Sequence, residues 1–492
     1  MAELGASERP LRVAIIGSGP SGFYAADALL KTDKAVKVDM FDRLPTPFGL
    51  VRGGVAPDHP RIRNVVKVYE RIAQNEHYSF LGNVEVGYNI TVPELKHYYD
   101  ALLFACGAET DRRMSIAGEE LPGSHGATQF VGWYNGHPDY RHLTFDLSQE
   151  VAVVIGVGNV AIDVSRMLCK TVDELRHTEI AQHALDAFAE SKIKEVHIIG
   201  RRGPAQAKFT TKELKELGEL ADCDPVVAPQ DLVIAPEDEA DMQDPTQKNN
   251  LKYLEEFAGR PPGKSKRLHF HFLSSPMKIL GTSHVKALLL GRNELVGPPG
   301  QRNVRSTGDT WELPCGLVFR SIGYRGLPMP GVPFNTRWGT IPNEGGRVTE
   351  AGEPVPGMYC TGWIKRGPSG VIGTNKPDSV ETVNNLLHDI GQLTPCPEPS
   401  TQAVIGLLRE RGTRVVSFED WKTIDDAEQL RGQAVHKPRE RFTQYYEMLS
   451  LIRSHELKNP GENAAGKAVA ENGNNHTSKP AKAARDRKGA AS

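Results

Sequence analysis

The chain opens with a change of hydrophobic period that marks a strand followed by a helix. Residues 11–16 form an apolar run interrupted only by Arg12. A glycine-rich turn follows, and from about residue 20 the apolar positions recur at helical spacing. A second strand-like run, Val36–Phe41, closes the unit. The pattern predicts a strand, a tight turn, a helix and a parallel strand, which together make a βαβ unit.

The same change of period occurs again about 140 residues later. Residues 150–170 repeat the strand, glycine turn and helix, and residues 194–202 supply the next strand. Two such units so far apart can each found a doubly wound sheet. We therefore predict an α/β fold with two Rossmann-like dinucleotide-binding domains. Strand-like runs at 98–109 and 313–324 flank the second unit, so we expect the second domain to be inserted in the first.

The remaining pattern completes the domain organisation. Residues 395–457 show helical periodicity and are expected to pack on the first domain. Residues 458–492 contain no aromatic residue, Leu or Ile, so we predict a disordered tail. The predicted segments are an N-terminal extension (1–10), the first part of the first domain (11–109), the inserted second domain (110–325), the second part of the first domain (326–394), a C-terminal helical extension (395–457) and the tail (458–492).

Composition and charge narrow the class of protein. Lys and Arg total 59 against 61 Asp and Glu, so the net charge of -2 provides no overall positive field to bind nucleic acid. No run approaches the ~18 apolar residues of a membrane helix, and the N-terminus lacks the apolar core of a signal peptide. We expect no membrane insertion and a cytoplasmic protein. The six cysteines are scattered, which argues against an iron–sulfur cluster, a zinc ribbon or a local dithiol, and we predict no metal site.

The first glycine turn has the spacing of a dinucleotide site. In this turn Gly17 permits a sharp bend, Gly19 leaves room for a pyrophosphate, and Gly22 lets the helix pack on the strand. Free N–H groups at the helix N-terminus can hold the phosphates. Asp42 ends the second strand 20 positions after Gly22, where a carboxylate can accept hydrogen bonds from ribose hydroxyls. The alternative is a glycine turn beside a solvated aspartate.

The second glycine turn differs at its matching acidic position. The turn reads Gly156-x-Gly158-x-x-Ala161, and the following strand ends in Arg201 and Arg202 with no carboxylate. Two guanidiniums can pair with a 2′-phosphate that a carboxylate would repel, so this site should prefer NADP over NAD. The alternative for the two arginines is a solvated strand edge.

Two unlike dinucleotide sites on one chain indicate hydride transfer between cofactors. A carboxylate-matched site for a permanently held FAD beside an arginine-matched site for exchangeable NADPH is the arrangement of a flavoenzyme. The flavin accepts two electrons at once and can release them singly. The residues leave open which acceptor receives these electrons, and a disulfide or internal cluster is disfavoured by the cysteine spacing. The alternative outside enzymes is a non-catalytic FAD- and NADP-binding sensor or docking module.

Longer strings of residues, in order from about residue 12 to residue 387, resemble one family. These strings are Phe48-Gly-Leu-Val-Arg52, Gly54-Val-Ala-Pro-Asp-His-Pro60, Gly82-Asn-Val-Glu-Val-Gly87, Phe130-Val-Gly-Trp-Tyr-Asn-Gly136, Gly200-Arg-Arg-Gly-Pro204 and Gly362-Trp-Ile-Lys-Arg-Gly-Pro-Ser-Gly-Val-Ile372. Together they resemble the adrenodoxin reductase family of ferredoxin–NADP reductases. The resemblance implies FAD, NADP(H), a small one-electron carrier and a glutathione-reductase-like architecture, with FAD on the first domain and NADP on the inserted domain.

The resemblance also assigns residues to the two cofactors by position. Gly370 would lie where nicotinamide approaches flavin, and a side chain there would block the stacking that hydride transfer needs. Besides the three glycines of the first turn, the FAD residues that it implies are Ser21, Asp42, Leu50, Val86, Trp363, Gly370, Val371 and Ile372. The NADP residues that it implies are Val157, Gly158, Asn159, Val160, Arg201, Arg202 and Glu213.

His59 and Asp163 match family positions discussed as aiding electron or proton transfer. A histidine near the flavin can relay a proton, because its pKa lies near working pH. For His59 the alternative is a loop hydrogen bond in its Pro-Asp-His-Pro turn. For Asp163 the alternative is an interaction with the dipole of its own helix.

The expected partner is a bacterial-type ferredoxin or flavodoxin, with electron flow in either direction. Vertebrate relatives dock adrenodoxin on an Arg-dense helix, whereas residues 251–267 here are acidic in the helix and basic only afterwards. Residues 373–376 and the C-terminal helices also look more like the bacterial members. Lys264, Lys266 and Arg267 are candidate docking charges, and a solvated basic loop is the alternative. The sequence carries no signal for the oligomeric state.

Overall fold

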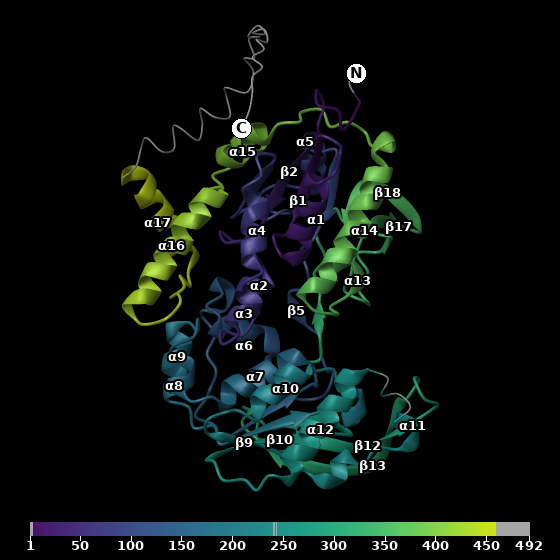
Figure 1. Ribbon diagram of the computed structural model, residues 1–492, viewed down its shortest axis with the longest axis vertical. Helices are drawn as coiled ribbons and strands as arrows, with labels where there is room; N and C mark the ends of the chain where they lie inside the picture. The colour runs from purple at the N-terminus through teal and green to yellow at the C-terminus, as the bar shows by residue number, and fades with distance from the viewer. Residues whose placement is uncertain (1–2, 240–241, 243, 459–492) are drawn as a thin grey trace, which may run out of the picture.

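The computed structural model describes residues 3–239, 242 and 244–458. Within these residues the strands form two large sheets, a three-stranded antiparallel sheet and a two-stranded link. Figure 1 shows the two large sheets in separate bodies, which we call the upper and lower bodies. The helices α16 (Phe418–Ala434) and α17 (Tyr445–Lys458) lie along one side of the upper body (Figure 1).

The upper body is built on a seven-stranded sheet to which two distant parts of the chain contribute. Five strands pair in parallel, and an antiparallel meander from the later part of the chain extends one edge. The sheet order is β16 (Asn343–Glu344), β17 (Arg347–Glu350), β18 (Glu353–Cys360), β4 (Ala101–Phe104), β1 (Leu11–Ile16), β2 (Val36–Phe41) and β3 (Tyr78–Leu81).

Both faces of the upper sheet are covered, which explains the continuous apolar run of its first strand. On β1, Leu11, Val13 and Ile15 pack into one buried cluster, and Ala14 and Ile16 pack into another on the opposite face. Strands buried on both faces need apolar residues at every position. The first face is covered by α1 (Pro20–Leu30), α4 (Val66–Ala73), α14 (Asn375–His388), α16 and α17, and the second by α5 (Val92–Tyr98) and α15 (Thr401–Glu410).

The lower body is built on a six-stranded parallel sheet. Its order is β6 (Ser124–Gly126), β14 (Leu317–Arg320), β7 (Val151–Ile155), β8 (Glu195–Ile199), β10 (Lys266–His271) and β9 (Cys223–Val227). Helices cover one face: α6 (Ala127–Tyr134), α7 (Asn159–Cys169), α9 (Gln182–Ala189), α10 (Thr211–Leu217) and α12 (Pro245–Gly259). The other face packs against the antiparallel sheet of β11 (Ser274–Leu280), β12 (Ala287–Val296) and β13 (Asn303–Pro314).

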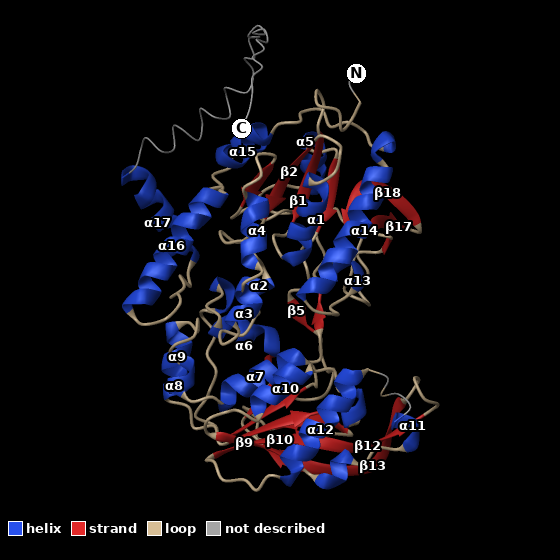
Figure 2. Cartoon of the chain, in the orientation of Figure 1, coloured by secondary structure: helices blue, strands red, loops and turns tan. Residues whose placement is uncertain are grey.

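Short helices lie mainly at turns and between the bodies (Figure 2). They are α2 (Leu50–Gly53), α3 (Pro60–Arg63), α8 (Val172–Leu175), α11 (Pro236–Glu239) and α13 (Trp363–Arg366). None of the helices described here is long and apolar enough to cross a membrane. The predicted α/β fold with two nucleotide-type parallel sheets is confirmed.

Two structures join the bodies. The chain passes between them at β5 (Thr110–Asp111) and β15 (Tyr324–Arg325), which pair in antiparallel fashion. The second connection is the segment 437–445 between α16 and α17. Its buried Arg441 donates hydrogen bonds to the Arg52 carbonyl (2.6 Å) on the upper side and the Asn135 carbonyl (2.8 Å) on the lower side. The predicted tail lies outside the described residues from residue 459 onward.

Candidate functional site

The first glycine turn has a separate local reason for each of its three glycines. Gly17 has φ +108° and lies so close to the Ala105 carbonyl that a Cβ would stand 2.5 Å from its oxygen. A Cβ on Gly22 would collide with the Gly17 carbonyl. Gly19 is different, since no atom lies within 4 Å of a Cβ placed there. The protein itself does not need Gly19, and the open space at the N-terminus of α1 fits a pyrophosphate.

Asp42 lies beside this turn at the end of β2. One of its oxygens accepts hydrogen bonds from the Ser18 N–H (3.1 Å) and hydroxyl, and the other accepts from the Leu44 N–H (2.9 Å). Burial raises the pKa of this carboxyl. Each carboxylate oxygen has two lone pairs, so the oxygen bonded only to Leu44 can still accept a ribose hydroxyl.

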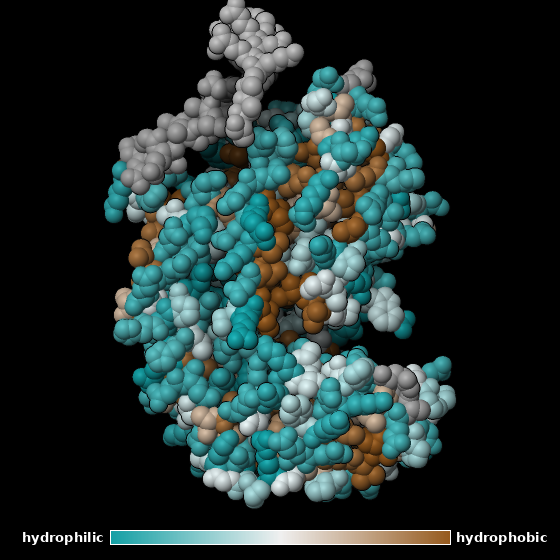
Figure 3. Space-filling view, viewed as in Figure 1, coloured by the Kyte–Doolittle hydropathy of each residue, from teal (hydrophilic) through white to brown (hydrophobic). Residues whose placement is uncertain are grey.

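The other residues assigned to FAD belong to several parts of the upper body. The loop before α2 approaches Gly19, since a Cβ on Gly49 would stand 3.0 Å from the Gly19 Cα. Leu50 and Val371 are exposed, at 39% and 57%, although both are large and apolar. Ser21 accepts a hydrogen bond at its carbonyl from the Ser379 hydroxyl (3.0 Å), which ties α1 to α14. Val86 is buried in the core cluster behind the sheet. Figure 3 shows apolar side chains at the centre of the upper body, between α4 and α14.

Gly370 has a backbone requirement that the sequence did not indicate. Its φ is +80°, and a Cβ would collide with the Thr374 hydroxyl. A glycine is therefore needed here whether or not nicotinamide stacks nearby. The neighbouring Trp363 supports this loop, because its indole N–H donates to the Ser369 carbonyl (3.1 Å) and its ring stacks on Tyr324 (5.4 Å). Ile372 begins the short 3-10 turn that follows.

The second glycine turn repeats the geometry of the first. Gly156 has φ +135° and lies against the Ser321 carbonyl, whereas Gly158 again faces open space at the start of α7. The turn is held in place by hydrogen bonds from the Lys208 N–H to the Val157 carbonyl (2.9 Å) and from the Thr210 N–H to the Asn159 side chain (2.8 Å). Val160, the second residue of α7, packs against the lower core.

Arg201 and Arg202 lie just beyond β8, after Gly200, and are both exposed. Among the described residues, neither guanidinium has a hydrogen-bond or ion-pair partner. Two free cations beside an open glycine turn fit a ligand with an extra phosphate.

Replacing Gly158 by alanine tests the open space without straining the fold. Its backbone angles (φ -109°, ψ 175°) suit any residue, and no protein atom is in the way. We expect an unchanged melting temperature, and about a tenfold higher KM for both NADPH and NADH because the Cβ meets the shared pyrophosphate. Gly156→Ala is the contrasting variant and should lower the melting temperature. An unchanged KM in Gly158→Ala would remove this glycine from the nucleotide site.

A buried group of charges lies between the bodies, centred on Arg166 of α7. This side chain is 1% exposed and makes a two-pronged ion pair with Asp58, at 2.9 and 3.0 Å. It also lies 2.7 Å from Asp163 and 3.0 Å from Glu213. Lys170 adds a second cation, 3.2 Å from Asp58. Because Asp58 belongs to the upper chain segment and the others to the lower body, the group bridges the two.

His59 lies in the same group and is 5% exposed. Its Nε2 is 2.7 Å from Glu216 and 3.6 Å from Glu213, and its Nδ1 is 4.0 Å from Asp163. Burial is the largest influence and opposes the protonated ring, but the hydrogen bond to Glu216 together with the charges of Asp163 and Asp58 raises the pKa of His59 above its ordinary value. Burial also raises the pKa of Glu213 to about 7 and that of Asp163. The structure therefore brings His59, Asp163 and Glu213 together as three neighbouring acid–base groups, each with its pKa raised above the ordinary value.

Sequence reasoning missed Asp58, Arg166, Lys170 and Glu216 as members of this group. Asp58 stands in the same motif as His59, which was a usable signal. Arg166 could not be recognised from its own segment, because only Asp163 is a local partner, whereas Asp58 and Glu213 come from two other segments of the chain.

The candidate docking charges are already engaged. The Lys264 ammonium donates to the Leu220 carbonyl (2.6 Å), Lys266 donates to the Leu168 carbonyl (3.3 Å), and Arg267 donates to the Lys266 carbonyl (2.8 Å). They also face Asp224, which lies 3.7 Å from Lys264 and 3.8 Å from Arg267. The three side chains are thus held by contacts within the protein, while those of Lys264 and Arg267 remain 33% and 28% exposed.

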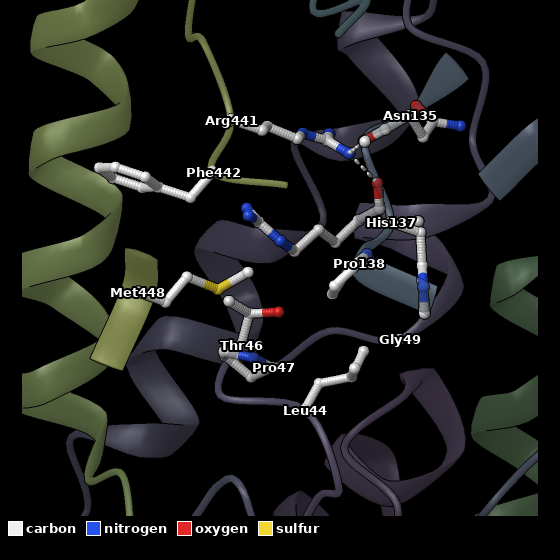
Figure 4. A pocket seen from close by; sticks show the side chains of 13 residues that line it. Leu44, Thr46, Pro47, Gly49, Asn135, His137, Pro138, Arg441, Phe442 and Met448 are labelled. Carbon is white, nitrogen blue, oxygen red and sulfur yellow. Dashed lines mark hydrogen bonds between the residues drawn. The ribbon is translucent and has the colours of Figure 1, made fainter. Parts of the chain in front are cut away.

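A small pocket opens where the upper body, the lower body and the C-terminal segment meet (Figure 4). Leu44 and Gly49 line it from the loops beside the first glycine turn, His137 from the lower body, and Arg441 and Met448 from the C-terminal part. The C-terminal extension therefore forms a wall beside the first nucleotide site.

Comparisons with known proteins agree with this geometry. The sequence profile of the family described as pyridine nucleotide-disulphide oxidoreductase matches residues 11–210. The chain is 45% identical over 456 residues to the NADPH-ferredoxin reductase FprA of Mycobacterium tuberculosis, covering 90% of this chain and 99% of that protein. It is 42% identical over 460 residues to the mitochondrial NADPH:adrenodoxin oxidoreductase of Homo sapiens, covering 90% and 92%.

A solved structure extends the match to three dimensions. Mycobacterium tuberculosis FprA in complex with NADPH superposes with a TM-score of 0.87 at 44% identity, over 90% of this chain and all of that one. Two glycine turns on two parallel sheets and these matches place the protein among the two-dinucleotide flavin oxidoreductases. Within that class, the chain belongs to the adrenodoxin reductase family of ferredoxin–NADP reductases, as its motifs predicted.

Proposed function

We propose that the protein is an FAD-dependent NADPH–ferredoxin reductase, with FAD bound by the upper body and NADP(H) by the lower. The main observation in support of this function is the pair of glycine turns with open space for a ligand. The strand that follows the first turn ends in a carboxylate, Asp42, whereas the strand that follows the second is followed by two cations, Arg201 and Arg202. Relatives named as NADPH-ferredoxin reductase and NADPH:adrenodoxin oxidoreductase support the same activity. In this proposal the FAD domain comprises residues 11–109 and 326–394, and the NADP domain residues 110–325.

The residues present fit both cofactors. Gly19 and Gly158 leave the space that a pyrophosphate needs, and α1 and α7 direct free N–H groups into it. Asp42 would accept hydrogen bonds from the ribose of FAD, and the two arginines would pair with the 2′-phosphate of NADPH. When bound, the flavin supplies an acceptor for a hydride from NADPH and a donor of single electrons to ferredoxin or flavodoxin.

The buried group between the bodies supplies acid–base chemistry. His59 is held by Glu216, and this hydrogen bond favours the protonated form of its ring. Burial raises the pKa of Asp163 and that of Glu213, so both carboxyls take up a proton more readily than free carboxyls do. Arg166 fixes the positions of Asp58, Asp163 and Glu213 and so orients this group. We assign His59 and Asp163 the role of proton relay to the bound flavin.

The proposed function is tested by anaerobic reduction of the purified yellow protein. Addition of NADPH should bleach the flavin absorbance, and a ferredoxin added afterwards should restore it. NADH at the same concentration is the matched control and should bleach much more slowly. A flavin-loaded protein that NADPH leaves yellow would instead be the non-catalytic FAD- and NADP-binding module.

The cellular setting follows from the thiols. All six cysteines are free, and all except Cys106 are buried. Unpaired thiols are typical of a reducing compartment, so we propose a cytoplasmic location.

A further inference from the structure

A group of imidazole and carboxylate side chains lies on the lower sheet, away from both glycine turns. Side chains two residues apart on a strand point to the same face, so Glu195-Val-His197 on β8 and His269-Phe-His271 on β10 each direct two polar groups to one side. β8 and β10 are parallel neighbours, and His197 is paired in register with His269. Strand order therefore places three imidazoles and one carboxylate side by side.

The face in question is the one that the antiparallel sheet covers. Ile199, two residues beyond His197, packs with residues of β12 such as Leu288, and the ring of His271 lies 5.2 Å from that of Trp311 on β13. His197 is 5% exposed.

The spacing of these groups suits a small cation. One ligand atom from each of Glu195, His197 and His269 lies within 4.8 Å of the other two. The His197 Nε2 is 3.2 Å from the Glu195 carboxylate. Two ligands bound at about 2.0–2.1 Å to a tetrahedral ion stand roughly 3.3 Å apart, nearly the same distance.

Two further contacts complete the arrangement. The His197 Nδ1 lies 2.9 Å from the His271 Nε2, which supplies the outer hydrogen bond that fixes the tautomer and orientation of metal-binding histidines. The Nε2 of His269 is buried and has no hydrogen-bond partner. A buried ring nitrogen without a partner is costly in an empty fold, and coordination would satisfy it.

We propose that Glu195, His197 and His269 bind a divalent transition metal ion of the zinc type. Two imidazoles and one carboxylate form an open ligand set for zinc, with water at the fourth position, whereas calcium and magnesium prefer oxygen ligands throughout. The scattered cysteines, on which the expectation of no metal site rested, say nothing about these histidines. Their two motifs are 74 residues apart and meet only through the sheet order.

A second group, His59 with Glu213 and Glu216, has similar spacing. It suits a metal less well, because the Arg166 guanidinium already lies 3.0 Å from Glu213 and repels a further cation.

The proposed ion lies away from the nucleotide. His197 is on β8, whereas Arg201 is four positions later, two residues beyond the end of that strand. The ion would link β8 to β10 and stabilise the lower body, since a ligand that binds only the folded state raises its stability.

The test uses tag-free, FAD-loaded protein stripped with a chelator. ZnCl2 is titrated by calorimetry, and CoCl2 by visible absorption, which reports tetrahedral coordination. We expect one ion per chain and a higher melting temperature in zinc. His269→Gln and the half-exposed Glu195→Gln should each weaken binding about tenfold or more. The exposed His142→Gln and the interdomain His59→Gln are matched controls and should bind as the natural protein does.

Several outcomes would overturn the proposal. One is a natural protein that binds neither ion, and another is His269→Gln and Glu195→Gln proteins that bind zinc undiminished. Loss of the ion in His59→Gln alone would assign it to the other group. NADPH oxidation and FAD content, unchanged in both site variants, would show that weakened binding does not come from misfolding.

Discussion

Replacing both Arg201 and Arg202 by alanine should lower kcat/KM for NADPH by about 100-fold or more and leave kcat/KM for NADH within twofold. A hydrogen bond to a charged group contributes roughly 1.5–3 kcal/mol, and both guanidiniums would be lost from the 2′-phosphate that NADH lacks. We expect the substitutions to affect ligand binding and not folding, because both side chains are exposed and make no hydrogen bond or ion pair with another described residue. Their removal should leave the melting temperature and FAD content unchanged.

Single variants and one control sharpen this experiment. Arg201→Ala and Arg202→Ala alone show how the two cations divide the contact. Arg305→Ala removes a similarly exposed guanidinium on β13, where it pairs with Glu294 at 2.7 Å, and should change neither cofactor. An equal loss with NADPH and NADH would exclude the arginines from the 2′-phosphate site.

Arg166→Met should destabilise the protein by about 3–5 kcal/mol, because it leaves a cluster of buried carboxylates without their central cation. Methionine fills nearly the same volume, so the loss reports charge rather than a cavity. The melting temperature should fall on the order of 10 °C. Circular dichroism would measure the melting temperature of the fold. The rise of flavin fluorescence on heating would measure the temperature at which the cofactor is released.

The effect should depend on pH in a defined direction. Glu213 has a pKa of about 7 in the folded protein, above its ordinary value, so it takes up a proton as the pH falls below 7. The repulsion left by Arg166→Met should therefore be weaker at pH 6 than at pH 8. Arg176→Met is the matched control, because Arg176 pairs with Asp173 at 2.8 Å on the exposed α8 and should cost less than about 1 kcal/mol. Equal melting temperatures for the two variants would contradict the role of Arg166.

The nucleotide turns could be predicted because all the residues that define each turn lie close together in the sequence. Gly17, Gly19 and Gly22 lie within one strand, turn and helix, and the hydrophobic period alone sets those elements. The structure adds that Gly17 and Gly22 are required by the protein's own backbone, whereas Gly19 and Gly158 are not. Sequence spacing cannot separate a glycine kept for packing from one kept for a ligand, and Gly370 illustrates this, since its positive φ and Thr374 require it independently of nicotinamide.

The interdomain contacts could not be predicted, because they depend on the final positions of separate segments. Asp58 and Arg166 are 108 residues apart, and their ion pair exists only once the two bodies meet. The C-terminal helices were predicted from periodicity. The hydrogen bonds of Arg441 could not be predicted from a helical pattern, because the guanidinium donates to backbone carbonyls of two distant residues, Arg52 and Asn135. The carbonyl partner of Lys264 could not be predicted either, since Leu220 lies 44 residues earlier in the chain.

The divided origin of the upper sheet sets an order for folding during synthesis. β4 lies between β1 and β18, and Leu102 pairs with Met358, so one edge of β4 stays unpaired until synthesis has reached residue 358 of 492. The strands of the lower sheet all lie between residues 124 and 320 and are complete well before then. Pairings between distant residues form slowly, and open strand edges invite association with other chains. We therefore expect the lower body to fold first during synthesis. The upper body should fold more slowly and stay prone to aggregation until β18 and the C-terminal helices have been made and have packed on it.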